Sequence, residues 1–92
     1  MERLPDSEVD ERLNASAWTR QGDVIEREFE RASFAAAFAL VDAVAELAME
    51  ADHHPDILMH DYKWVRITLS THSAGGITER DFALAAQIDA LT

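Results

Sequence analysis

The stretch that decides the fold is KWVRITLSTHSAGGITERDFALAAQIDA, residues 63–90. Its first part places Val65, Ile67 and Leu69 on one side and mostly polar residues on the other, which is typical of a β-strand with one buried face. The loop SAGG follows this strand. Thr78 is a suitable helix N-cap, and a final helix is expected to run from there through about Ala90. A strand, a tight loop and a helix in one segment indicate a mixed α and β domain.

Upstream, the alanine-rich residues 33–51 predict a long helix. The apolar stripe that we expect to face the core consists of Phe34, Phe38, Val41, Ala45 and Ala48, widened by Val44 and Leu47. Pro55 must end this helix and pushes His54 out of the helical conformation. A further strand is expected over residues 57–62, with a tight turn leading into the strand that contains Val65.

The N-terminal third predicts a short helix followed by a hairpin. Residues 6–14 form an amphipathic pattern that Asp6 or Ser7 can cap. A Gly-Asp pair then separates two short strands, over about 17–21 and 24–29, which is the pattern of a β-hairpin.

The predicted order is therefore α-β-β-α-β-β-α. The simplest packing for this order is a four-stranded antiparallel sheet with helices packed on one face, which is an α+β fold. The length of 92 residues leaves room for one core, so we expect residues 1–92 to form a single domain.

Composition excludes several classes of function. The chain has 18 Asp and Glu against 8 Lys and Arg, a net charge of −10, which argues against nucleic-acid binding because phosphates would be repelled. It has no cysteine, which excludes disulfide scaffolds, zinc–thiolate sites and thiol nucleophiles. The longest apolar run, 34–41, is too short for a membrane span, and the N-terminus has no apolar signal-peptide core. We therefore expect a cytoplasmic protein without nucleic-acid or membrane partners.

Four side chains could carry chemistry: His53, His54, His72 and Asp81. The first two end the long helix, His72 is expected at the end of the last strand, and Asp81 lies in the first turn of the last helix. If both junctions lie at one end of the sheet, three imidazoles and a carboxylate would share a pocket. The alternatives are a polar helix end, an exposed strand end and a capping box for Asp81. A metal site is disfavoured, because adjacent histidines at a helix end rarely converge on one ion. His60 has no evident partner.

The motif DHHPD, the aromatic Tyr62, the phrase ITLSTH and the phrase GGITERD together resemble the pterin-4a-carbinolamine dehydratase family (4a-hydroxytetrahydrobiopterin dehydratase). The resemblance covers about residues 48–88. It implies the fold described above, in dimers that often pair into tetramers. It also implies removal of water from 4a-hydroxytetrahydropterin, giving quinonoid dihydropterin, in the recycling of the pterin used by aromatic amino-acid hydroxylases. The pterin is the substrate, and the resemblance implies neither a cofactor nor a metal.

The resemblance further implies a role for each candidate. His53 and His72 would be the acid/base pair, His54 would orient the pterin with a share in proton transfer, and Asp81 would polarise a histidine or bind the ring. The remaining residues expected around the substrate are Asp52, Ser70, Thr71, Ser73 and Arg80, the last of them as a partner of Asp81. Met49 stands where family members usually carry a polar residue, four positions before His53. The alternative is a non-catalytic relative that acts as an assembly or partner-binding module, as some family members do.

Overall fold

The computed structural model describes all 92 residues. The elements in chain order are α1 (Asp6–Leu13), β1 (Thr19–Gln21), β2 (Val24–Glu30), α2 (Phe34–Ala51), β3 (Asp56–His60), β4 (Trp64–Leu69), the short 3₁₀ helix η1 (His72–Ala74) and α3 (Glu79–Asp89). The expected order α-β-β-α-β-β-α and the α+β class are confirmed. None of the helices is both long and apolar enough to cross a membrane.

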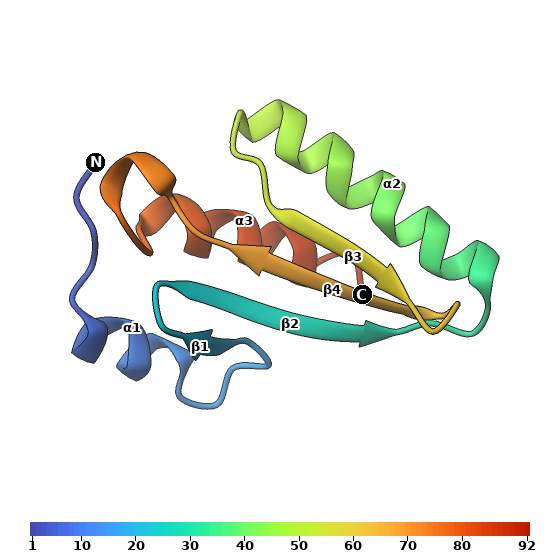
Figure 1. The fold of residues 1–92 in the computed structure, drawn as a ribbon, viewed down its shortest axis with the longest axis horizontal. Coiled ribbons are helices and arrows are strands. Elements are labelled where there is room, and N and C mark those ends of the chain that lie inside the picture. Colours follow the sequence, from blue (N-terminus) through green and yellow to red (C-terminus); the bar gives the residue numbers. More distant parts are fainter.

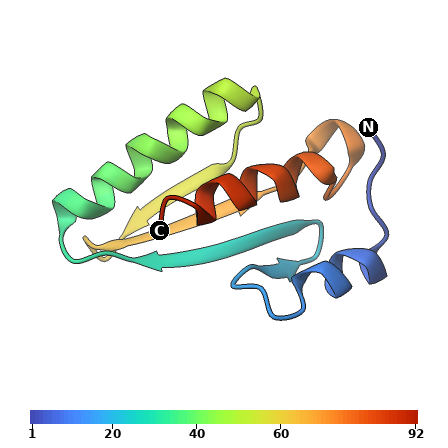
Figure 2. The same ribbon diagram turned by 180° about the vertical axis from the view of Figure 1, so that it is seen from behind.

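The four strands form one antiparallel sheet in the order β1-β2-β4-β3. Two hairpins, β1–β2 and β3–β4, meet through the pairing of β2 with β4 in the middle of the sheet. Figures 1 and 2 show α2 and α3 over one face of the sheet, with α1 beside β1 at its edge. The helices thus cover one face, as expected, and the other face is open.

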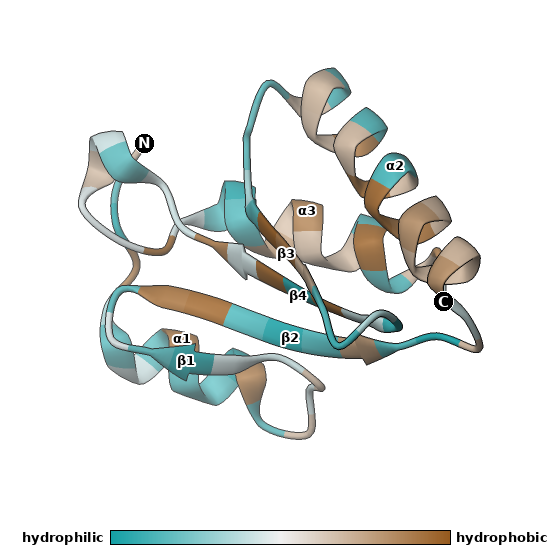
Figure 3. Cartoon of the chain, turned by 45° about the vertical axis from the view of Figure 1, so that its right-hand side comes forward, coloured by the Kyte–Doolittle hydropathy of each residue, from teal (hydrophilic) through white to brown (hydrophobic).

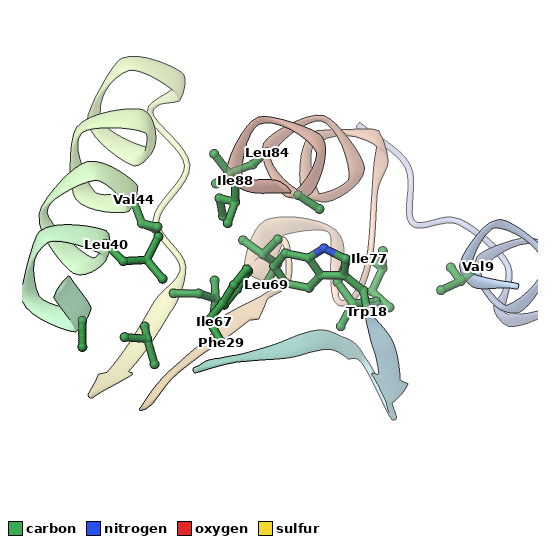
Figure 4. Close-up of a cluster of buried hydrophobic side chains, with 14 residues drawn as sticks. Val9, Trp18, Phe29, Leu40, Val44, Ile67, Leu69, Ile77, Leu84 and Ile88 are labelled. Atoms are coloured by element: carbon green, nitrogen blue, oxygen red, sulfur yellow. The ribbon is translucent and has the colours of Figure 1, made fainter. Parts of the chain in front are cut away.

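The core lies between the sheet and the helices (Figure 4). Strand β4 contributes Val65, Ile67 and Leu69, which are completely buried and confirm the predicted alternation. The other members of the core cluster are Val9, Trp18, Ile25, Phe29, Ala37, Leu40, Val44, Ile77, Leu84, Ala85 and Ile88. Burying a large apolar side chain contributes about 1.5–3 kcal/mol, so this cluster holds α2 and α3 on the sheet.

The prediction for the buried face of α2 is wrong in part. Phe34 and Phe38 were expected in the core, but they are 59% and 60% exposed. The residues of α2 that are buried are Ala37, Leu40, Val44 and Ala48. At 100° per residue, the centre of this set lies roughly 75° around the helix from the centre of the five-residue stripe, on the side to which Val44 and Leu47 were expected to widen it. Figure 3 shows the reason: α2 is apolar around much of its circumference, so its pattern does not single out one face.

The start of α1 also differs from the prediction, which had Asp6 or Ser7 as the cap. The helix begins directly after Pro5, and no side chain caps it. Instead, the carbonyl of Pro5 accepts hydrogen bonds from the backbone N–H groups of Glu8 and Val9, at 3.0 and 3.1 Å. Pro5 is therefore the N-cap residue, and its backbone is extended, with φ −61° and ψ 147°.

Strand β4 ends at Leu69, earlier than predicted, so His72 does not end a strand. It begins η1 instead, within a tight loop that Thr71 and Gly76 close by pairing as an isolated antiparallel bridge. The N–H of Thr71 donates to the carbonyl of Gly76 at 2.8 Å. Gly75 has a φ of +76°, a conformation that glycine adopts without steric cost. The loop therefore turns His72 away from the line of the strand.

The open face of the sheet contains an ion cluster around His60, for which the sequence suggested no partner. Its imidazole hydrogen bonds to Glu28 through Nε2 and to Asp61 through Nδ1, each at 2.9 Å, and its ring stacks on Trp64. Glu28 also accepts a hydrogen bond from Arg66 at 2.5 Å. Since Glu28 belongs to β2 and His60 to β3, the cluster spans β4 and ties the edge strand to the sheet.

We expect this cluster to make the stability of the protein depend on pH. Hydrogen bonds to Glu28 and Asp61 raise the pKa of His60, because they favour the charged imidazole. The stabilisation is therefore fully present below the unfolded pKa of about 6.5 and is lost as pH rises through the raised folded value. Urea unfolding of the wild type and His60→Gln across that range tests this. The difference in free energy of unfolding should shrink as pH rises, and a constant difference would contradict the expectation.

Candidate functional site

The site begins at the C-terminal end of α2, which turns sharply before His53. Asp52 adopts the left-handed conformation, with φ +49°, and ends the helix. The backbone N–H of His53 donates to the carbonyl of Ala48 at 3.1 Å, and that of Asp52 to the carbonyl of Met49 at 3.3 Å. This is the Schellman pattern of helix termination, and Pro55 prevents the helix from resuming. The turn directs the His53 side chain into the protein, where the residue is buried.

The start of α3 supplies the second component. Thr78 caps the helix, and its hydroxyl accepts a hydrogen bond from the backbone N–H of Arg80 at 3.2 Å. The carboxylate of Asp81 in turn accepts a hydrogen bond from the backbone N–H of Thr78 at 2.9 Å. These reciprocal bonds form the capping box that the sequence offered as the structural role of Asp81.

Asp81 also joins the two helices. One of its carboxylate oxygens lies 2.5 Å from Nε2 of His53, and the other accepts a hydrogen bond from the Thr71 hydroxyl at 2.9 Å. The hydroxyls of Thr71 and Thr78 lie 2.8 Å apart. All four residues are buried. The network therefore connects the end of α2, the loop after β4 and the first turn of α3.

This network fixes how His53 presents its ring. We assign Nε2 of His53 as the donor to Asp81, because the other carboxylate oxygen already accepts from Thr71 and Thr78. Nδ1 of His53 has no hydrogen-bond partner in the protein. Every fully buried polar side-chain atom does have a partner, so Nδ1 is not fully buried and reaches the surface. An imidazole held in this way can accept a proton at the free nitrogen while the carboxylate stabilises the cation that forms.

A pocket of about 330 Å³ opens beside His53, between the end of α2 and one side of α3. Its lining residues are Ala51, His53, Arg80, Ala83, Leu84 and Gln87. Four of them were not predicted: Ala51, Ala83, Leu84 and Gln87. The spacing of the last three from Arg80, at i+3, i+4 and i+7, marks one face of a helix and could have indicated them.

Arg80 was expected to be a partner of Asp81, but the side chains of these two residues are not hydrogen bonded to each other. Its guanidinium donates to the backbone carbonyl of Asp52 at 2.5 Å and to that of Ala51 at 3.3 Å. Both carbonyls belong to the end of α2, where the last carbonyls of a helix lack partners within the helix. Arg80 therefore forms a second link between α3 and α2, beside the His53–Asp81 link.

His54 and His72 are exposed, and neither lines the pocket. Each follows a member of the buried network in sequence, His54 after His53 and His72 after Thr71, so both lie beside it. The expectation of three imidazoles and a carboxylate in one pocket therefore holds only in part. The structure joins His53 to Asp81 and leaves the other two histidines on the surface.

A family model for pterin 4 alpha carbinolamine dehydratase matches residues 2–91 of the chain. The chain belongs to this family. A relative from Roseiflexus sp. (strain RS-1) is 52% identical over 90 residues, which cover 95% of this chain and 94% of the relative. Another from Nocardia farcinica (strain IFM 10152) is 60% identical over 76 residues, covering 80% and 77%. Both are named "Putative pterin-4-alpha-carbinolamine dehydratase".

Two solved structures share the fold of this dehydratase family. A transcriptional coactivator/pterin dehydratase from Brucella melitensis has a TM-score of 0.89 and 36% identity, with 97% of each chain covered. A pterin dehydratase-like protein, described as a RuBisCO assembly factor in the alpha-carboxysome, has a TM-score of 0.69 and 34% identity, with 84% of this chain and 90% of that one covered. The descriptions of these two proteins thus name different roles for one fold.

The other residues that the dehydratase resemblance suggested lie around the same end of the molecule. Asp52 and Ser73 are exposed and Ser70 is half-buried, so their polar groups can be reached from solvent. Met49 is 65% exposed on α2, so its thioether also lies at the surface. No group of three or more His, Asp or Glu side chains is arranged to hold a metal ion.

Proposed function

We propose that this dehydratase-family protein removes water from 4a-hydroxytetrahydropterin to give quinonoid dihydropterin, in cytoplasmic tetrahydropterin recycling. The observation that carries the proposal is the buried His53–Asp81 pair beside an open pocket. An imidazole supported by a carboxylate is suited to proton transfer near neutral pH, because the reference pKa of histidine is about 6.5. Membership of the family supplies the substrate class.

In this reaction the bond between C4a and its hydroxyl oxygen breaks while a double bond forms between C4a and N5. The proton on N5 passes to Nδ1 of His53, and Asp81 stabilises the resulting imidazolium. The leaving hydroxyl takes a proton from His72 and departs as water. His53 then releases its proton to solvent and His72 regains one, so the protons balance. No electron passes to or from the protein, so the pterin is a substrate and the step requires no redox cofactor.

The other residues suggested by the resemblance fall into two groups. Some have polar groups that are free to contact the pterin, and others are already hydrogen bonded within the protein. His54 would hold and orient the pterin ring, with further polar contacts from Asp52, Ser70 and Ser73. The hydroxyl of Thr71 is hydrogen bonded to Asp81, and the guanidinium of Arg80 to carbonyls of α2, so these two would act through the protein.

The proposal is tested by following the absorbance of chemically generated 4a-hydroxytetrahydropterin with and without purified protein. We expect the protein to accelerate loss of this compound, and the His53→Ala/His72→Ala double variant to remove the acceleration. Circular dichroism must show that both proteins are folded. If folded wild-type protein gives only the uncatalysed rate, the dehydratase proposal is wrong.

The second candidate function is a partner-binding or assembly module. The observation that favours it is the outward side of α2, where Phe34, Phe38 and Met49 are each about 60% exposed. Exposed apolar patches of this kind are typical of protein–protein contact surfaces. The related structure described as a RuBisCO assembly factor shows that the fold occurs in such a protein. Under the first proposal, the functional partner would instead be the aromatic amino-acid hydroxylase that produces the substrate.

The same surface of α2 supports the proposal that the chain forms homodimers or homotetramers. We expect Phe34→Ser/Phe38→Ser to lower the mass measured by light scattering to that of a monomer, because two large apolar side chains would leave the contact. Tyr62→Ser is a matched control, since it removes an aromatic that is 62% exposed in the β3–β4 turn. An unchanged mass in the double variant would exclude this face of α2 as the contact.

A further inference from the structure

We infer that Arg80 is a positioning residue that holds His53 in place by tying down the last carbonyls of α2. The inference rests on the proposed dehydratase function for its catalytic readout. It does not require Arg80 to touch the pterin, and it replaces the expected contact between Arg80 and Asp81 with a contact to the main chain.

The two links between α2 and α3 are adjacent in both segments. Arg80 of α3 donates to the carbonyl of Asp52 at the end of α2. Asp81, which follows Arg80, is hydrogen bonded to the ring of His53, which follows Asp52. A shift of the α2 end would therefore break both links, whereas a rotation of the His53 ring alone would break only the second. Arg80 thus fixes the backbone from which the imidazole extends, and Asp81 fixes the orientation of the ring.

The conformation at this point needs such support. Asp52 has a φ of +49°, which is uncommon for a residue with a side chain. The carbonyls at a helix C-terminus attract a cation, and one nitrogen of the guanidinium, Nη2, donates to the carbonyls of both Ala51 and Asp52. A lysine would keep the charge, but on a compact and more strongly hydrated ammonium, so it should support the turn only in part.

Displacing a catalytic group by about 1 Å can reduce the rate by about 10²-fold. We therefore expect Arg80→Gln to lower the kcat of dehydration by about 10–100-fold, with little change in KM. Arg80→Lys should recover part of this loss. The matched control is Arg12→Gln, which removes an arginine that pairs with Glu79, the neighbour of Arg80, and with Glu8, but that has no hydrogen bond or ion pair with α2.

A second readout does not depend on activity. In ¹⁵N-edited NMR spectra of the imidazoles, Arg80→Gln should shift the His53 ring signals. The His60 signals, from the opposite face of the sheet, should stay in place, and Arg12→Gln should leave both unchanged. If the wild type has no dehydratase activity but the His53 signals move as expected, the positioning role stands and only the proposed function fails.

Two results would overturn the inference. One is an Arg80→Gln variant with kcat within about twofold of the wild type and unshifted His53 signals. The other is a rise in KM alone with unshifted His53 signals, which would make Arg80 a substrate-binding residue. If Arg80→Gln does not fold, the same criteria apply to Arg80→Lys, which keeps the charge at the end of α2.

Discussion

Replacing Asp81 by alanine is expected to lower the free energy of unfolding by about 3–5 kcal/mol. The Asp81 side chain is completely buried and hydrogen bonds with His53, Thr71 and Thr78. Alanine would leave the His53 ring and the Thr78 N–H without their acceptor in the protein interior, where each unsatisfied group costs about 1–3 kcal/mol, and the Thr71 hydroxyl would keep only that of Thr78. The expected loss therefore exceeds the cost of removing an ordinary helix cap, which is typically about 1 kcal/mol.

Urea unfolding followed by circular dichroism measures this loss. Asp81→Asn is the matched control, because asparagine has the same shape and keeps one acceptor oxygen but replaces the other by a donor. Its loss should be smaller than that of alanine. If Asp81→Ala unfolds with a free energy within about 1 kcal/mol of the wild type, the buried network contributes far less than its hydrogen bonds indicate.

Replacing His72 by alanine is expected to lower the kcat of the proposed dehydration by about 10²–10⁴-fold, the usual contribution of a general acid. The same change should alter the free energy of unfolding by no more than about 0.5 kcal/mol, because His72 is exposed on η1. His72 is thus a cleaner catalytic test than His53, whose ring belongs to the buried network and whose loss would affect rate and stability together.

Steady-state kinetics and urea unfolding on one preparation separate these effects. His54→Ala serves as the comparison, since it removes a neighbouring exposed imidazole that is proposed to hold the substrate and should mainly raise KM. A His72→Ala variant that keeps more than half of the wild-type kcat would show that another group protonates the leaving hydroxyl.

Most of the fold could be predicted because its elements have local signals. The alternation around Val65 defines β4, Pro55 ends α2, and Thr78 starts α3, and each of these depends only on neighbouring residues. The buried face of α2 could not be predicted in the same way. Phe34 and Phe38 fit an apolar stripe as well as the buried residues do, and only the position of the sheet beneath α2 decides between them.

The candidate site likewise has features that the sequence indicates and features that depend on how the helices pack. The proximity of His53 to Asp81 could be anticipated, because one residue follows the end of a helix and the other begins one, whereas their pairing was suggested only by the family resemblance. The role of Arg80 could not, because its acceptors are the carbonyls of Ala51 and Asp52, and every residue has a carbonyl. The contribution of Gln87 to the pocket likewise depends on how closely α3 approaches the end of α2.

Asp81 has two roles, as part of the helix cap and as partner of His53, and this affects which residues can change as the family diverges. A lineage that abandoned catalysis would still lose stability by changing Asp81, so selection for folding alone would preserve it together with Thr71 and Thr78. His54 and His72 are exposed, and replacing them should cost little stability, so we expect these two residues to be substituted first. Relatives that retain the aspartate but have lost both surface histidines are therefore expected to be those that kept the scaffold for binding alone.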